Sequence, residues 1–129
     1  MENTNINIPT TTVDGFIDTL AQVYTAEIQA GISFKSIPTP FLWGSTGVGK
    51  SEGVSQLAEM IEKNTGKRVV VTDVRLLLFS PVDLRGVPIA NKNMEFTNWL
   101  RPKLFAMDES PDCINILFLD ELSAAPQSV

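Results

Sequence analysis

A glycine-rich loop directly after an apolar run is the feature that most constrains how this chain can fold. Residues 41–53 read FLWGSTGVGKSEG, and residues 44–51 satisfy the pattern G-x-x-x-x-G-K-[ST]. Glycines let successive backbone N–H groups turn inward around an anion, and a following helix adds the positive end of its dipole. The sequence therefore predicts a buried strand at 41–43, then a phosphate-binding loop, then a helix.

Each position of this loop has an expected role toward a nucleotide. Lys50 would reach the β- and γ-phosphates, and the Ser51 hydroxyl would ligate Mg²⁺. The alternative is a glycine-rich turn that carries a solvated lysine. We expect all eight residues of the loop to contact the bound nucleotide: Gly44, Ser45, Thr46, Gly47, Val48, Gly49, Lys50 and Ser51.

Hydrophobic spacing predicts two helices around the loop. Residues 1–11 are polar and are typical of a loose N-terminal tail. Apolar residues at three- and four-residue spacing then predict a helix from Thr12 with one buried stripe and a C-cap at Gly31. The same spacing after the loop predicts a second helix that ends at residues 64–66, Asn-Thr-Gly.

Two further apolar runs predict strands. The run from Val69 to Leu78 is too uniformly apolar for a half-exposed strand, so a strand covered on both faces is expected. The run at 114–119, INILFL, predicts a further buried strand. Three prolines within residues 80–103 predict a long loop or a hairpin excursion, and Pro126 suits the first turn of a helix. Alternating strands and helices predict an α/β layered fold with a mainly parallel sheet.

Two carboxylates at the end of the last apolar run predict the second half of the site. Asp120 would emerge at the C-terminal edge of the sheet, where the phosphate loop also lies, and would help to hold Mg²⁺, which prefers oxygen ligands. Glu121 would polarise a water in line with the γ-phosphate. Taken alone, the pair is equally compatible with a strand entering a polar turn. Together with the loop, it favours hydrolysis over phosphoryl transfer by a metabolite kinase.

A competing motif, DLRG at 83–86, fits the D-x-x-G that GTPases use at their metal. The residues before it, Ser-Pro-Val at 80–82, are incompatible with the strand that such a motif needs, because proline is excluded from central strands. No N-K-x-D guanine reader follows. ATP is therefore preferred over GTP.

Composition limits the remaining classes of function. Ten basic and fifteen acidic side chains give a net charge of −5 and a pI near 4.6, so no strong signal for nucleic-acid or membrane binding exists. The absence of histidine and the single cysteine, Cys113, exclude an intramolecular disulfide and the usual zinc sites. The sequence shows neither a signal peptide nor an apolar run long enough to span a bilayer, so a cytoplasmic location is expected.

Three segments together carry a resemblance to a known family. With GSTGVGKS, DLRGVP at 83–88 and LFLDELSAAPQSV at 117–129, the chain resembles AAA+ ATPases, most closely their MoxR-like branch. The resemblance covers about residues 32–129. It implies a three-layer P-loop NTPase core with a mainly parallel sheet, of which residues 12–129 form the N-terminal part.

The resemblance also implies the site and its ligands. Residues 44–51 correspond to the Walker A motif with Lys50, and residues 116–121 to Walker B, with Asp120 organising the metal and Glu121 activating water. ATP and Mg²⁺ are the implied cofactors. The implied activity is ATP hydrolysis by a homo-oligomeric ring, often a hexamer, that remodels protein partners. The implied partner is a protein substrate or an accessory protein.

Several alternatives stay open at this point. Relatives continue past Walker B with a sensor-1 strand, an arginine finger and a helical lid, so the chain is expected to be a truncated or partial representative with a gap in its sheet. A nucleotide-binding module without turnover is the second functional hypothesis. Arg85 would either touch a substrate or neighbouring subunit, or stabilise a turn. Trp99 would either lie at an interface or anchor a hairpin.

Overall fold

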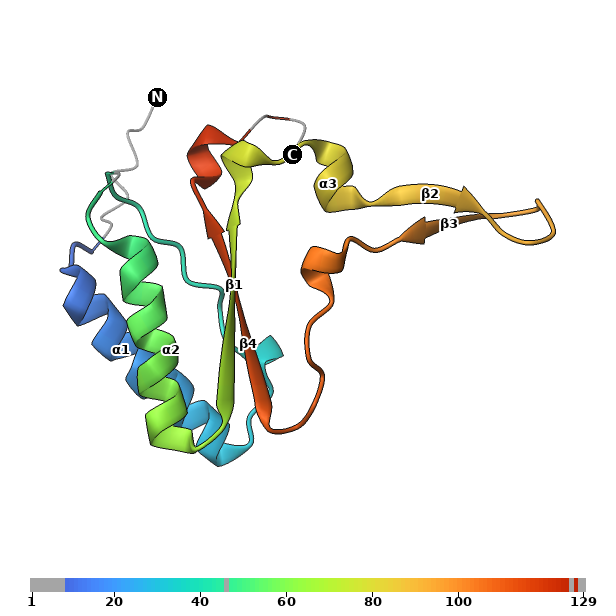
Figure 1. Cartoon of the computed structure of the whole chain (residues 1–129). Coiled ribbons are helices and arrows are strands. Elements are labelled where there is room, and N and C mark those ends of the chain that lie inside the picture. The colour runs from blue at the N-terminus through green and yellow to red at the C-terminus, as the bar shows by residue number, and fades with distance from the viewer. Residues whose placement is uncertain (1–8, 46, 126, 128–129) are drawn as a thin grey trace, which may run out of the picture. The chain divides into compact units, whose positions relative to one another are not determined.

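The computed structural model describes residues 9–45, 47–125 and 127, and the chain divides into two compact units, residues 1–66 and 67–129 (Figure 1). The predictions for Thr46, Pro126 and most of the N-terminal tail lie outside the described residues. The first unit contains two α-helices and the second contains a parallel strand pair, a short helix and a β-hairpin. Single turns of 3₁₀-helix lie at Phe34–Ser36, Leu76–Leu78, Lys103–Phe105 and Leu122–Ala124.

The first predicted helix is confirmed as α1, Val13–Ala30. Its N-cap is Thr12, whose side-chain oxygen accepts a hydrogen bond from the backbone N–H of Gly15 at 3.1 Å. Its C-cap is Gly31 in the left-handed conformation, with φ 67° and ψ 23°. Both ends therefore follow from local chemistry that the sequence displays.

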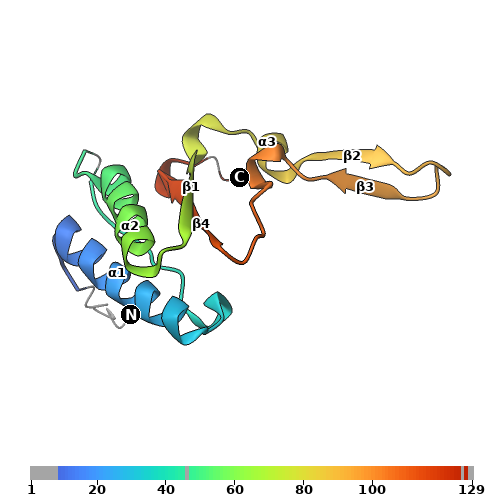
Figure 2. The ribbon, with the colours of Figure 1, turned by 60° about the horizontal axis from the view of Figure 1, so that its bottom comes forward.

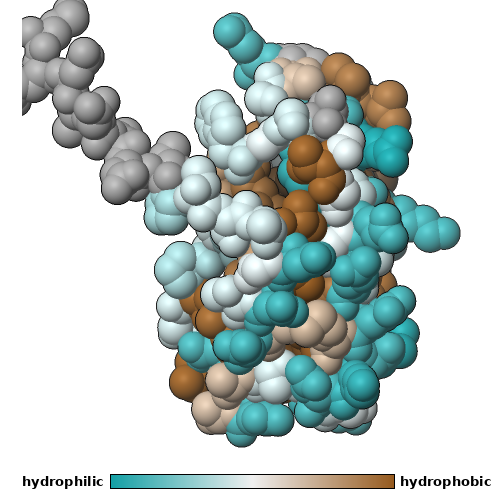
Figure 3. Space-filling view, turned by 90° about the vertical axis from the view of Figure 1, so that its left-hand side faces the viewer, coloured by the Kyte–Doolittle hydropathy of each residue, from teal (hydrophilic) through white to brown (hydrophobic). Residues whose placement is uncertain are grey.

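The second predicted helix is confirmed as α2, Lys50–Thr65, which ends at Gly66 with φ 70°. Figures 1 and 2 show α1 and α2 side by side. Gly53 brings them close, because a Cβ at this position would lie 3.0 Å from Val13 Cγ1 and 3.2 Å from Ile17 Cγ1. Hydrophilic side chains cover much of the outer surface over these helices (Figure 3). The buried apolar residues of the pair are Ile17, Ala21, Val54, Leu57, Ala58 and Ile61.

The prediction of a buried strand at 41–43 is wrong. These residues form no regular element, and Phe41 and Trp43 are 63% and 80% exposed. Their rings contact each other instead, with centroids 5.9 Å apart. The physical reason is that a strand needs a hydrogen-bonded neighbour, and the described part of the first unit contains no strand to pair with.

The two later strands are confirmed as β1, Arg68–Arg75, and β4, Cys113–Asp120. They pair in parallel, from Arg68 opposite Cys113 to Arg75 opposite Asp120. The predicted cover of β1 on both faces is wrong, because β1 is mostly half-buried. The predicted burial of β4 is wrong as well, because Leu117 and Leu119 are more than 40% exposed. No third strand joins this sheet within the described residues, so each strand has one edge without a neighbouring strand. The run predicted to reach Leu78 leaves the strand at Arg75 and continues as a 3₁₀ turn.

The segment between β1 and β4 confirms the prediction of a hairpin excursion. It contains α3, Pro81–Arg85, followed by β2, Val87–Ala90, and β3, Thr97–Leu100, which pair antiparallel (Figure 2). Pro81 occupies the first turn of α3, where the missing N–H costs nothing. Gly86 joins α3 to β2 with φ 87° and ψ −173°, a conformation open essentially to glycine alone.

The chain thus has an α/β fold with a small parallel sheet, as the alternation of elements predicts. Among the described residues, no helix combines the length and the apolar character that crossing a membrane requires.

Candidate phosphate-binding site

Two glycines of the loop have left-handed backbone conformations, which anion-binding turns use. Gly47 has φ 78° and Gly49 has φ 89° and ψ 20°, so both lie in the left-handed region that other residues rarely adopt. Open space surrounds the position of a Cβ at each of them. Backbone conformation, and not crowding, therefore explains why these two positions are glycine.

Lys50 folds back over the loop that precedes it. Its Nζ donates a hydrogen bond to the backbone carbonyl oxygen of Gly44 at 2.9 Å. The ammonium group is thereby held across the loop, between its first residue and the start of α2. This is the position from which a lysine can meet a phosphate bound to the loop.

The start of α2 adds further groups that suit an anion. Gly49 is its N-cap and supplies no side-chain acceptor for the N–H groups of the first turn. Ser51 lies in this turn, half-buried, and its carbonyl oxygen accepts a hydrogen bond from Ser55 at 3.4 Å. The positive end of the helix dipole therefore faces the loop, at a helix of 16 residues.

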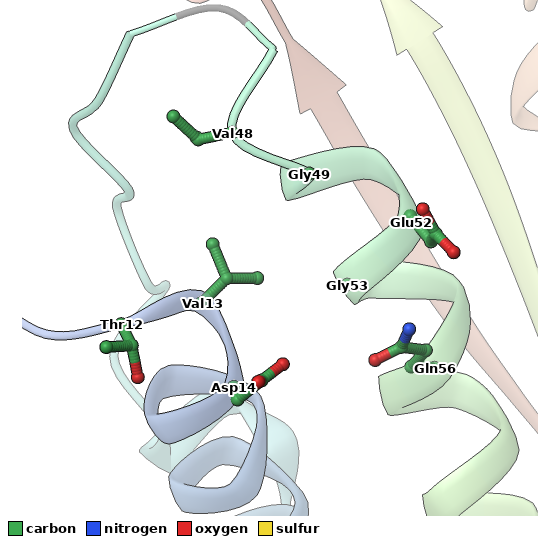
Figure 4. Close-up of a pocket in the computed structure, with 8 residues that line it drawn as sticks. All are labelled: Thr12, Val13, Asp14, Val48, Gly49, Glu52, Gly53 and Gln56. Carbon is green, nitrogen blue, oxygen red and sulfur yellow. The ribbon is translucent and has the colours of Figure 1, made fainter.

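A pocket of about 330 Å³ lies beside the loop, between the N-terminal ends of α1 and α2 (Figure 4). This volume is at the lower end of the range for small-molecule sites, roughly 300 to 1,000 Å³. In Figure 4, Val13 and Asp14 of α1 and Gln56 of α2 point toward the space between the helices, whereas Glu52 lies on the side of α2 away from α1. The lining residues are Thr12, Val13, Asp14, Val48, Gly49, Glu52, Gly53 and Gln56.

Sequence reasoning missed the contribution of α1 to this pocket. Thr12, Asp14 and Gln56 belong to no motif, and only the packing of the two helices brings them near the loop. The one available signal is Gly53, since a glycine inside a helical pattern often marks a close approach of another element.

In the second unit, Asp120 and Glu121 lie at the C-terminal end of β4 as predicted. Both are half-buried, and the backbone N–H of Glu121 donates to Asp120 Oδ1 at 2.9 Å. Glu121 has φ 56° and ψ 40°, a left-handed conformation that is uncommon for any residue other than glycine. Such conformations cost roughly 1 to 3 kcal/mol and cluster at functional sites.

The structure thus brings the predicted residues together in two groups. The described loop residues lie before and at the start of α2 in the first unit, and Asp120 and Glu121 lie next to each other at the end of β4 in the second. The proposed metal ligands, Ser51 and Asp120, come one from each group. Both offer the hard oxygen atoms that Mg²⁺ prefers. Within the described residues, no group of three Asp, Glu, Cys or His side chains is arranged to hold a metal ion.

The D-x-x-G segment has a structural explanation that needs no nucleotide. Asp83 is the third residue of α3, and its Oδ2 accepts hydrogen bonds from the backbone N–H and the hydroxyl of Ser80, at 2.8 and 2.7 Å. This is a capping box. The bonds from Ser80 hold the pKa of the Asp83 carboxyl below its ordinary value.

Arg85 and Trp99 are both exposed, the latter by 55%. No hydrogen bond or ion pair of the Arg85 side chain occurs among the described residues, so the structure does not support the hypothesis that Arg85 stabilises a turn.

Comparisons of the chain with protein-family models, curated proteins and solved structures gave no match.

Proposed function

We propose that this chain binds ATP with Mg²⁺ and forms the nucleotide-binding part of an AAA+ ATPase of the MoxR-like type, which hydrolyses ATP to remodel protein partners. The observation that carries the proposal is the loop at 44–51. It has left-handed glycines, a lysine folded over it at 2.9 Å from Gly44, and a long helix at its end. The three-layer P-loop core and the homo-oligomeric ring belong to the same proposal.

Phosphate binding would exchange weak local contacts for stronger ones. The Lys50 ammonium group, now bonded to a neutral carbonyl, would turn to the β- and γ-phosphates. Hydrogen bonds between two charged groups are roughly twice as strong as neutral ones. The N-terminus of α2 would add its partial positive charge.

The pocket beside the loop also supports the proposal of ATP binding, since a nucleoside needs space next to its phosphates. Asp14 offers acceptor atoms and Gln56 offers both donor and acceptor atoms for the edge of a base. Gly53 also lines the pocket, where the absence of a side chain lets Val13 and Ile17 of α1 pack close to α2.

Hydrolysis would require the carboxylates of the second unit. The Ser51 hydroxyl and the Asp120 carboxylate would hold Mg²⁺, which neutralises charge on the phosphates when bound. Glu121 would accept a proton from the attacking water. Its left-handed backbone conformation supports a functional role, because such conformations cluster at functional sites.

Thermal unfolding with ATP and Mg²⁺ tests the binding half of the proposal. At a ligand concentration 100 times Kd the free energy of unfolding rises by about 2.7 kcal/mol, and Tm by several degrees. Lys50→Ala should abolish this shift. Lys63→Ala, which removes an exposed lysine from the last turn of the same helix, should retain it. An undiminished shift in Lys50→Ala would contradict the proposed cradle.

Release of inorganic phosphate tests the hydrolytic half. Glu121→Gln should leave the thermal shift intact and slow phosphate release by about 10² to 10⁴, the usual contribution of a general base. Glu109→Gln, at an exposed position before β4, is the matched control. A protein that shows the shift but releases no phosphate in any form would be a nucleotide-binding module instead.

A further inference from the structure

The β2–β3 hairpin presents apolar side chains on both of its faces. The register pairs Val87 with Leu100 and Pro88 with Trp99. Directly paired residues share a face, so Val87, Ile89 and Leu100 lie on one face and Trp99 lies on the other. All of these side chains are at least 42% exposed, and Phe96, at the turn, is 70% exposed. A two-stranded hairpin with two exposed faces is marginally stable on its own.

The two edges of the hairpin differ. The backbone N–H of Asn91 donates to the carbonyl of Phe96 at 2.8 Å, which marks a hydrogen-bonded pair. Hydrogen-bonded and non-hydrogen-bonded pairs alternate in antiparallel sheets, so the pairs of Thr97 and Trp99 are of the second kind. Their backbone N–H and C=O groups therefore point away from β2. Among the described residues, no other strand pairs with this edge.

The opposite edge is protected. Pro88 lies across from Trp99, in a non-hydrogen-bonded pair, so its missing N–H leaves the hairpin intact and removes a donor from the outer edge of β2. Only the β3 edge can extend the sheet with a full set of backbone groups.

The hairpin and its flanks are basic although the chain is acidic. Residues 85–103 carry four basic side chains, Arg85, Lys92, Arg101 and Lys103, and one acidic side chain, Glu95. The whole chain has a net charge of −5. All four basic side chains are exposed, and none forms an ion pair within the part of the chain that the structure describes.

We propose that the β3 edge binds an extended, acidic segment of a partner protein, which adds a third strand to the hairpin. Backbone groups of Thr97 and Trp99 would pair with the segment, its apolar side chains would cover those of the hairpin, and its carboxylates would meet Arg101 and Lys103. The proposal extends the partner-binding half of the proposed function, and it does not depend on nucleotide.

Charge and shape favour this occupant over two others. A second copy of the hairpin would bring two clusters of like charge together, which is unfavourable. A single-stranded nucleic acid would match the charge, but it binds by stacking bases on aromatic rings. Trp99 and Phe96 offer two such rings, but the open strand edge offers backbone N–H and C=O groups, which pair with a peptide backbone and not with stacked bases.

Fluorescence anisotropy of a labelled peptide of alternating glutamate and valine, titrated with the full chain without nucleotide, tests the proposal. We expect saturable binding that weakens at high salt, and slower hydrogen exchange of the Thr97 and Trp99 amides in the complex. The same peptide with lysine in place of glutamate should bind at least about tenfold more weakly, since attraction becomes repulsion. Equal binding of both peptides overturns the proposal.

Different substitutions test the backbone groups of the β3 edge and the basic side chains beside it separately. Thr97→Pro removes an outward N–H and should abolish binding, whereas Thr97→Val keeps this N–H and should bind like the wild type. Arg101→Glu combined with Lys103→Glu should weaken binding at least about tenfold, and Lys63→Glu should not. The charge reversals remain decisive if Thr97→Pro disturbs the hairpin.

Lys50→Ala should bind the peptide normally, so a failure of peptide binding can be distinguished from a failure of nucleotide binding. Tighter binding of oligothymidylate, or hairpin-dependent dimers in sedimentation, would contradict the proposal.

Discussion

Gly86 lies directly against the backbone carbonyl of Leu100, so that a Cβ added at position 86 would collide with this oxygen. The contact closes the base of the hairpin, where β2 begins and β3 ends. Gly86 also has φ 87° and ψ −173°, which excludes other residues on conformational grounds. Two independent constraints thus act on the glycine of the DLRG segment, and neither involves a nucleotide.

Gly86→Ala should therefore open the hairpin. Strain in this backbone region and overpacking against Leu100 together should cost about 3 kcal/mol. Gly31→Ala is the matched control, because Gly31 also has positive φ but open space around its Cβ, so a loss of about 1 kcal/mol is expected. Urea unfolding followed by backbone amide NMR signals of each unit measures both losses. Equal losses would refute a specific role of the Leu100 contact.

The close approach of α1 and α2 at Gly53 predicts the effect of a large side chain there. Gly53→Leu would push Val13 and Ile17 of α1 away from α2 and should destabilise the chain by about 1 to 3 kcal/mol. Glu59→Leu places the same side chain on the exposed face of α2 and should change stability by no more than about 0.5 kcal/mol. Far-UV circular dichroism during urea unfolding compares them, and similar midpoints would contradict the observed packing.

The capping box of α3 predicts a pH dependence. Hydrogen bonds from Ser80 lower the pKa of Asp83. The ionised form therefore stabilises the fold at pH values above the ordinary aspartate pKa, and this contribution is lost as the pH falls through the lowered pKa. Ser80→Ala removes the largest cause and should raise the pKa of Asp83, as followed by the carboxyl carbon resonance in NMR.

Asp108 provides the control for that titration. Its pKa is lowered chiefly by hydrogen bonds from Ser110, and further by Arg68. Ser110→Ala should raise the pKa of Asp108 and leave that of Asp83 unchanged. A Ser80→Ala variant whose Asp83 titrates as in the wild type would show that the capping box is not formed in solution.

The left-handed conformation of Glu121 predicts opposite effects on stability and activity. Glu121→Gly should relieve strain and raise the free energy of unfolding by about 0.5 to 1 kcal/mol. Glu121→Gln keeps the strained backbone and should leave stability nearly unchanged. Both variants should lose phosphate release if Glu121 activates water. A destabilised Glu121→Gly variant would contradict the conformation described for this residue.

Trp43 supplies a natural probe of nucleotide binding. It is 80% exposed and directly precedes Gly44, the first residue of the loop. We expect ATP to change its fluorescence in a Trp99→Phe variant, and to leave the fluorescence of Trp99 unchanged in a Trp43→Phe variant. Titration with ATP measures both signals. A response confined to Trp99 would place the nucleotide elsewhere.

The sequence predicts helix ends and loop glycines well, because these depend on neighbours along the chain. Gly31, Gly66 and Gly49 adopt the left-handed conformations that their positions demand. The capping residues of α1 and the position of the 80–103 excursion also follow from local chemistry. The left-handed glycines of the loop, Gly47 and Gly49, follow from the motif, whereas the binding of a phosphate by this loop stays a prediction.

Features that depend on distant partners could not be predicted in the same way. Residues 41–43 have the apolar composition of a strand, yet a strand exists only where another one pairs with it. Leu117 and Leu119 belong to an apolar run, but their exposure is decided by what packs on β4. The left-handed backbone of Glu121 has no signal in the sequence, since glutamate rarely adopts it.

The register of β1 and β4 has a consequence for how the chain folds. Each pair joins residues 45 positions apart, from Arg68 with Cys113 to Arg75 with Asp120. Closing a flexible loop of this length costs about 3 kcal/mol of chain entropy before any pair forms, whereas α2 grows from contacts four residues apart. Pulse-labelled hydrogen exchange should find α2 protected before β4, and the reverse order would contradict this. Until the loop closes, the uncharged segment 114–119 is an unpaired, aggregation-prone strand in every newly made molecule.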